Sequence, residues 1–148
     1  MISNYIALMN RDLILFQIGR IQYKASRFLL GELRQHGITG IAPSHGEILG
    51  FLLVRGPMSM KEIAALIDKD KSTITALVDK LIGMEFVIKR KSPGDSRVNI
   101  ISLTEKGEAL KGKYKDISSR LRAKAYRDIS EEERETLSRL LERLNRNL

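Results

Sequence analysis

The stretch from Ser59 to Thr104 constrains the fold most, because its hydrophobic period changes from that of a helix to that of a strand. It begins with an S-x-x-E capping box at Ser59 and Glu62, which predicts a short helix ending near residue 67. A polar break at residues 68–70 follows. Asp70 is suited to cap a second helix, since its carboxylate can accept hydrogen bonds from the free amides of the first turn.

The second helix is predicted to have one apolar and one polar face. Apolar side chains recur at i, i+3, i+4 and i+7, at Ile74, Leu77, Val78 and Leu81. The opposite face carries small or polar side chains, namely Lys71, Ser72, Thr75, Ala76, Asp79 and Lys80. After Gly83 the pattern indicates two strands, residues 86–88 and 98–103, joined through a basic run and a Pro-Gly turn. Helix, turn, helix and basic hairpin is the order of a winged helix-turn-helix.

A short apolar helix precedes this segment. Ser44 and Glu47 are predicted to form a capping box at its start, and Gly56-Pro57 is expected to end it. We therefore expect a mainly α fold of the α+β winged-helix type. Residues 41–104 would form the winged helix-turn-helix lobe, and residues 1–40 and 105–148 would form a helical dimerisation region.

The terminal regions are predicted to be amphipathic helices. Residues 4–35 carry a heptad-like apolar stripe at Ile14, Ile18, Ile21, Ala25 and Phe28. A basic helix after residue 104 carries Leu110, Tyr114, Ile117, Leu121 and Ala125. A last helix, with a capping box at Ser130 and Glu133, carries Leu137, Leu140, Leu141, Leu144 and Leu148. Such helices bury little within one chain, so we expect a two-fold homodimer, with a monomeric bundle as the alternative.

The charge balance favours a polyanionic partner. Lys and Arg total 26 against 18 Asp and Glu, which gives a formal net charge of +8 at pH 7. The absence of cysteine excludes disulfides and zinc–thiolate sites. The sequence has no apolar run near the ~18 residues of a membrane span and no signal peptide at its start, so a cytoplasmic location is expected by default.

The sequence offers poor support for enzyme chemistry. His36 and His45 are its only histidines, and no carboxylates cluster at ligand spacing. Neither a zinc site nor a Cys/His dyad can be assembled, and phosphate-loop and dinucleotide glycine patterns are absent. We expect no enzymatic activity, no metal and no cofactor, and a structural role for both histidines near a helix end or cap.

The second helix is the candidate DNA reader. A major groove about 12 Å wide admits a helix whose outer side chains are small. The side chains that meet this requirement are Ser72, Thr73, Thr75 and Ala76. Hydroxyls and first-turn amides can bind phosphate at a helix N-terminus, Lys71 adds positive charge, and Lys80 can reach the DNA backbone. Asp79 is expected to pair with Lys80 or another basic side chain rather than with a cytosine amine; an ordinary solvated face is the alternative.

The predicted hairpin supplies a second set of candidate DNA contacts. Its basic run is Lys89, Arg90 and Lys91, and Asp95 and Arg97 follow the turn. An arginine at a hairpin tip can enter the minor groove, and Asp95 could hold its guanidinium in position. The alternative is a solvated turn with a surface ion pair worth ~0–1 kcal/mol.

Residues 59–107 resemble the MarR family of transcriptional regulators. The resemblance rests on the pattern SxxEIAxLIxxxKSTIT-LVDKL, the Asp95-x-Arg97 pair and the run LTEKG, and the flanking helices match the family's dimerisation arrangement. It implies a winged-helix homodimer, in most cases a repressor, that binds a palindromic operator in double-stranded DNA. It matches Ser72, Thr73 and Thr75 to reading-helix positions. Two residues depart from the pattern: Ala76 stands where a basic residue is common, and Glu85 stands where a glycine usually ends the helix.

The resemblance also implies release from DNA by a small anionic or phenolic effector. The natural site for such a ligand is a cleft between the first long helix and the lobe, involving Tyr23, Arg27, His36 or His45. A packed cleft without a ligand is the alternative. A winged helix that serves as a protein-interaction or dimerisation module, without specific DNA binding, is the alternative function.

Overall fold

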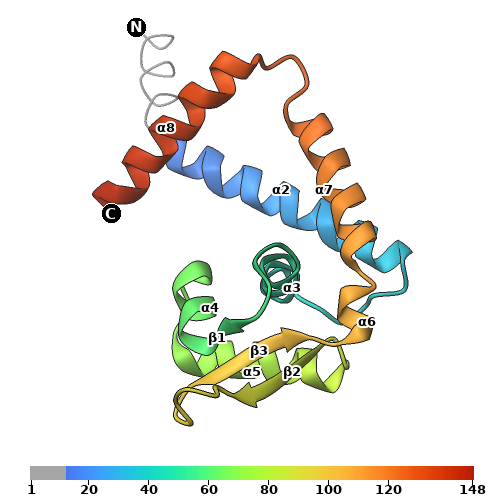
Figure 1. Ribbon diagram of the computed structural model, residues 1–148. Helices are drawn as coiled ribbons and strands as arrows, with labels where there is room; N and C mark the ends of the chain where they lie inside the picture. The colour runs from blue at the N-terminus through green and yellow to red at the C-terminus, as the bar shows by residue number, and fades with distance from the viewer. Residues whose placement is uncertain (1–12) are drawn as a thin grey trace, which may run out of the picture.

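The computed structural model describes residues 13–148, so residues 4–12 of the first expected helix lie outside the described part. The elements follow along the chain as α2 (Ile14–Gln35), α3 (Pro43–Arg55), β1 (Met58–Ser59), α4 (Met60–Ile67), α5 (Lys71–Gly83), β2 (Val87–Lys91), β3 (Asn99–Leu103), α6 (Glu105–Glu108), α7 (Lys111–Ala125) and α8 (Glu131–Asn147). Figure 1 shows α3 between α2 on one side and the α4, α5 and sheet layer on the other. The fold is the expected mainly α winged helix.

A three-stranded antiparallel sheet in the order β1-β3-β2 forms the edge of the lobe. β2 and β3 pair from Val87 with Leu103 to Lys91 with Asn99, and this hairpin is the wing. β1 adds Met58 opposite Ile101 on the other side of β3. β1 was not predicted from the sequence, because two residues are too few to show a period of two.

The hydrophobic core lies where α3, α4, α5 and the sheet meet, and α2 and α7 extend it. Its most deeply buried side chains are less than 2% exposed: Leu33, Ile48, Leu49, Leu52, Ile63, Ile74, Val78, Leu81, Val87, Ile101 and Ile117. The predicted inward face of α5 is confirmed at Ile74, Val78 and Leu81, which are all fully buried. Each such side chain contributes roughly 1.5–3 kcal/mol through removal from water.

The helices outside the lobe differ in how much they bury. α7 packs against α2, and the Arg120 guanidinium forms an ion pair with Glu32 across this contact. The Tyr114 hydroxyl donates a 3.2 Å hydrogen bond to the carbonyl oxygen of Gly46 on α3. α8 buries none of its residues, and Figure 1 shows it crossing beside α2, away from the lobe.

Three of the four predicted helix caps are confirmed. Ser59 with Glu62 and Ser130 with Glu133 form capping boxes, and Asp70 caps α5. The capping box predicted at Ser44 and Glu47 is wrong.

α3 starts earlier than that prediction assumed. Pro43 takes its first position, where the fixed φ of proline suits a helix and its missing N–H costs nothing. Ala42 is therefore the N-cap, and its backbone N–H donates a 2.9 Å hydrogen bond to Nδ1 of His45. Among residues 13–148, no helix is both long enough and apolar enough to span a membrane.

Candidate nucleic-acid interface

The outer face of α5 is open and built of small or polar side chains. Lys71, Ser72, Ala76, Asp79 and Lys80 are exposed, while Thr73 and Thr75 are partly buried. This face is the side of α5 opposite Ile74, Val78 and Leu81, so the core fixes which residues point outward. The structure therefore brings together all the residues predicted on the reading helix.

Asp70 organises the start of α5. Its Oδ1 accepts from the Ser72 hydroxyl at 2.6 Å and from the Thr73 backbone N–H at 2.9 Å, and its Oδ2 accepts from the Thr73 hydroxyl at 2.8 Å. These hydrogen bonds, that from the Ser72 side chain first, hold the pKa of Asp70 well below its usual range. The Thr75 hydroxyl donates to the Lys71 carbonyl oxygen at 2.8 Å.

Asp79 forms an ion pair with a residue of the neighbouring strand β2 rather than with one of its own helix. Its Oδ1 lies 3.4 Å from Nζ of Lys89 on β2. The prediction of an intramolecular pair is thus confirmed with a basic side chain other than Lys80. Lys89 offsets the negative charge of Asp79, and the pair ties the reading helix to the first strand of the wing.

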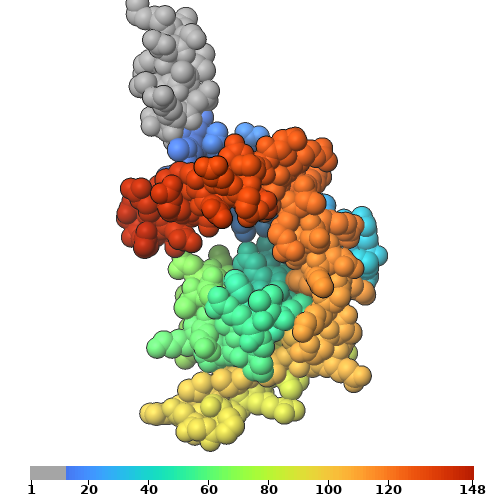
Figure 2. Space-filling model, turned by 45° about the horizontal axis from the view of Figure 1, so that its top comes forward, coloured from blue at the N-terminus to red at the C-terminus, as the bar shows by residue number. Residues whose placement is uncertain are grey.

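The wing carries its arginine at the tip. The Arg97 side chain is 90% exposed, and its Nε and Nη2 donate to the two Asp95 carboxylate oxygens at 3.1 and 3.2 Å. The Arg97 backbone N–H donates to Asp95 as well, at 2.9 Å. Hydrogen bonds from the Arg97 side chain and then from its backbone lower the pKa of Asp95. Figure 2 shows the yellow hairpin as the outermost part of the lobe, where Lys89, Arg90 and Lys91 are also exposed.

Two residues of the LTEKG run, Thr104 and Lys106, hold the end of α5, a role that was not predicted for them. Lys106 Nζ donates to the Met84 carbonyl oxygen at 2.9 Å and lies 5.0 Å from the centre of the Phe86 ring. The Thr104 hydroxyl donates to the Glu85 carbonyl oxygen at 2.6 Å. These bonds satisfy carbonyls that a helix end leaves free. The short helix α6 therefore joins the reading helix to α7, a role that only the contacts reveal.

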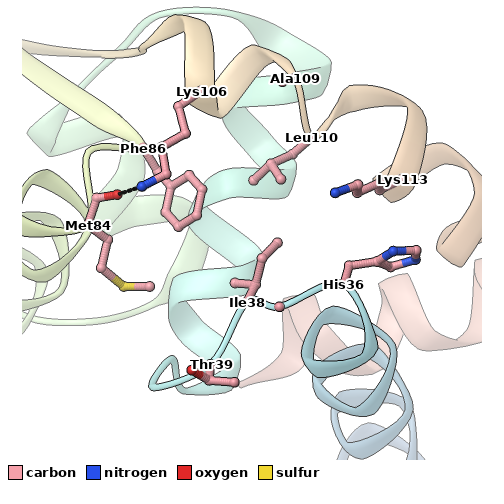
Figure 3. A pocket seen from close by; sticks show the side chains of 10 residues that line it. His36, Ile38, Thr39, Met84, Phe86, Lys106, Ala109, Leu110 and Lys113 are labelled. Carbon is pink, nitrogen blue, oxygen red and sulfur yellow. Dashed lines mark hydrogen bonds between the residues drawn. The ribbon is translucent and has the colours of Figure 1, made fainter.

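A crevice of about 440 Å³ opens at this junction. Figure 3 shows Phe86, Ile38 and Leu110 as its apolar floor, with Lys106, Lys113 and His36 around it. Of the four side chains predicted at an effector site, only His36 lines it.

The other three predicted effector-site residues lie elsewhere on α2 and α3. Tyr23 is exposed on α2 with the Arg27 guanidinium 5.7 Å from its ring centre, and His45 is 8% exposed at the start of α3. The structure does not gather the four residues into one cavity, and the effector site stays a prediction.

The MarR family model matches residues 41–98 of the chain. Over 109 residues the chain is 31% identical to the HTH-type transcriptional regulator MhqR of Bacillus subtilis. The matched residues make up 73% of this chain and 74% of that protein. It is 30% identical over 122 residues to the HTH-type transcriptional regulator BilQ of Clostridium symbiosum, with 80% and 81% covered.

The chain belongs to the MarR family. Solved structures agree on the fold of this family. A MarR transcriptional regulator from Methanosarcina mazei Go1 superposes with a TM-score of 0.78 at 20% identity, covering 92% of this chain and 96% of that one. The S. aureus MepR–DNA complex gives 0.78 at 21% identity, covering 91% and 98%. The named curated relatives are transcriptional regulators, and so are the proteins of the MarR family to which this chain belongs.

Proposed function

We propose that this MarR-family regulator binds an operator in double-stranded DNA as a homodimer, with α5 in the major groove and the wing in the adjacent minor groove. The observation that carries the proposal is the pairing of an exposed, small-residue face on α5 with a hairpin whose Arg97 side chain is 90% exposed. A groove about 12 Å wide admits such a helix, and a narrow minor groove attracts such an arginine.

Positive charge on the lobe supports contact with the DNA backbone. Lys71 and Lys80 flank the outer face of α5, and the wing strand β2 adds three basic side chains. Two acidic side chains of this surface, Asp79 and Asp95, are paired with Lys89 and Arg97. Lys71, Lys80, Arg90 and Lys91 form no ion pair among residues 13–148. These cations would neutralise phosphates and release counterions, so affinity should fall steeply as salt rises.

The homodimer is supported by apolar surface that one chain leaves uncovered. Four leucines of α8, Leu137, Leu140, Leu141 and Leu144, are each 37–45% exposed, and Ile14 and Ile21 of α2 are at least 50% exposed. A two-fold dimer would bury both stripes and place two reading helices about 34–36 Å apart, one turn of B-DNA. In this proposal residues 41–104 form the DNA-binding lobe, and residues 1–40 and 105–148 form the dimerisation region.

The test is binding to DNA fragments that the purified protein selects from a random pool. Fluorescence anisotropy across a salt series should give log affinity falling by about 0.9 per neutralised phosphate for each unit of log salt. Arg97→Ala should weaken binding to many sequences together and lower this slope by about 1. Arg122→Ala is the matched control, because Arg122 is an exposed arginine on α7, outside the lobe. Failure to select any fragment, or equal effects of the two variants, would favour a protein-interaction module instead.

A further inference from the structure

In the proposed function, on which this inference rests, α5 enters the major groove. The first turn of α5 carries two hydroxyl groups whose protons are already donated to Asp70. The Ser72 and Thr73 hydroxyls both lie within 2.8 Å of the Asp70 carboxylate. An ionised carboxylate can only accept hydrogen bonds, so each hydroxyl must be the donor. The low pKa of Asp70, caused by these same bonds, keeps the carboxylate ionised at neutral pH. Toward solvent, the two hydroxyls therefore offer lone pairs only.

This polarity argues against phosphate as the partner of these hydroxyls. To donate to a phosphate oxygen, Ser72 would have to give up a charge-assisted bond of 2.6 Å to one anion for a similar bond to another. Asp70 would at the same time repel the phosphate. Lys71 is the adjacent exposed side chain that can contact phosphate without this conflict.

Ser72 is the hydroxyl best placed to meet a base edge. It shares one exposed face with Ala76 and Asp79, at spacings of four and three residues along α5. Ala76 has no hydrogen-bonding side chain, and Asp79 is engaged by Lys89 at 3.4 Å. Thr73 and Thr75 are partly buried, which leaves Ser72 as the exposed hydroxyl of the outer face.

We propose that Asp70 is a specificity-determining positioning residue that holds Ser72 as a hydrogen-bond acceptor for an exocyclic amino group in the major groove. Adenine N6 and cytosine N4 are the amino donors displayed there, whereas guanine O6 and thymine O4 are acceptors. At the base that Ser72 contacts, the protein therefore prefers adenine or cytosine to guanine or thymine. Inverting that base pair exchanges an amino group for a keto group on the contacted strand and is disfavoured.

The experiment starts from a selected operator in which each base pair is inverted in turn. The position read by Ser72 is the one whose preference disappears in Ser72→Ala. There the wild-type protein should favour the amino base over the keto base by about 5- to 100-fold, the usual range for one base contact. Where the selected base is adenine, replacing it with a purine that lacks the 6-amino group should lose most of that factor.

Asp70→Gly is the decisive variant, because glycine caps a helix almost as well as aspartate and leaves both hydroxyl protons free. A freed hydroxyl can donate as well as accept, so the preference should fall to about 2-fold or less. Asp68→Asn is the matched control for charge. It removes one negative charge two residues away at a position with φ +53°, which asparagine tolerates. It should raise affinity for all sequences and leave the preference intact.

The outcomes separate this proposal from the proposed function. A wild-type preference for guanine or thymine at the Ser72 position would overturn it, and so would a preference that survives in Asp70→Gly. A Ser72→Ala variant that changes no position would overturn it as well. Each of these results is compatible with a DNA-binding regulator, whereas a wild-type protein that selects no DNA contradicts the proposed function itself.

Discussion

The winged lobe and helix α8 treat their apolar side chains in opposite ways. In the lobe, Ile74, Val78 and Leu81 of α5 are completely buried within one chain. In α8, Leu141 and Leu144 remain 38% and 37% exposed, and none of its residues is buried. Both helices carry an apolar stripe, so the stripe alone does not tell where a helix packs. The lobe is stabilised by its own chain, and α8 depends on what covers it.

The largest effect should come from removing a buried side chain of the lobe. Leu81→Ala removes most of a fully buried side chain of α5, and such changes cost about 2–5 kcal/mol of unfolding free energy. Denaturant unfolding followed by circular dichroism should show this loss at every protein concentration. A loss that disappears at high concentration would mean that the lobe, too, depends on a partner.

A second pair of substitutions tests the exposed leucines of α8. Leu141→Glu combined with Leu144→Glu places two charges on the stripe that we propose to be covered by the second copy. Sedimentation at micromolar concentration should show a dimer for the wild type and a monomer for the double variant, with the lobe still folded. The matched control is Glu135→Gln with Glu142→Gln, which alters two other exposed residues of the same helix without disturbing the leucines. A stable, folded wild-type monomer would contradict the dimer.

Gly107 is a buried residue of α6, the short helix that links the lobe to α7. A Cβ added there would lie 2.2 Å from the Phe86 backbone carbonyl oxygen and 2.9 Å from Leu103 Cδ2. Gly107→Ala must therefore shift backbone, and we expect it to lower the unfolding free energy by about 3 kcal/mol. Gly112→Ala is the control, because nothing lies within 4 Å of its added Cβ in α7. It should raise the unfolding free energy by up to ~1 kcal/mol.

Local signals in the sequence predicted most of the lobe. Capping residues such as Asp70 and Ser59 act within a few residues, so their partners are adjacent in the chain and can be predicted. The Asp95 and Arg97 pair was predictable for the same reason. Contacts between distant segments were not: Lys89 with Asp79, Lys106 with Met84, and β1 with β3 depend on how the elements pack. The effector site could not be predicted reliably for the same reason, because residues that line a cavity come from segments far apart in the chain.

The buried His45 should make stability depend on pH at the start of α3. Burial lowers the pKa of His45, so the folded state binds fewer protons at this site than the unfolded state. The contribution of neutral His45 to the unfolding free energy is fully present above the ordinary pKa of 6.5 and is lost as the pH falls below it. The unfolding free energy should fall by less than the limit of about 1.4 kcal/mol per pH unit for one proton.

Thermal or denaturant unfolding between pH 7.5 and 5.5 should show this loss. His45→Asn can still accept from the Ala42 N–H without titrating, and it should flatten the profile. An unchanged profile in His45→Asn would assign the pH dependence to other groups.

The smallest effect is expected where α5 ends. Glu85 adopts φ +63°, a left-handed conformation that costs an ordinary residue about 1–2 kcal/mol and glycine nothing. Glycine adds unfolded-state entropy, so Glu85→Gly should raise the unfolding free energy by a net of about 0.5–1 kcal/mol. The change also removes the ion pair between Glu85 and Lys106, whose charged atoms lie 3.6 Å apart. The Glu85 side chain is 82% exposed. Such a surface pair contributes ~0–1 kcal/mol.

Glu85→Ala separates these two contributions, because alanine removes the ion pair but keeps the unfavourable φ. The Gly variant should be more stable than the Ala variant by roughly 1 kcal/mol, measured as a shift of the denaturant midpoint at constant slope. Since α5 would end in the same way, affinity for DNA should stay within about 2-fold of the wild type. If both variants lose stability equally, the Lys106 ion pair rather than the backbone conformation governs this helix end, and α6 holds the reading helix through charge.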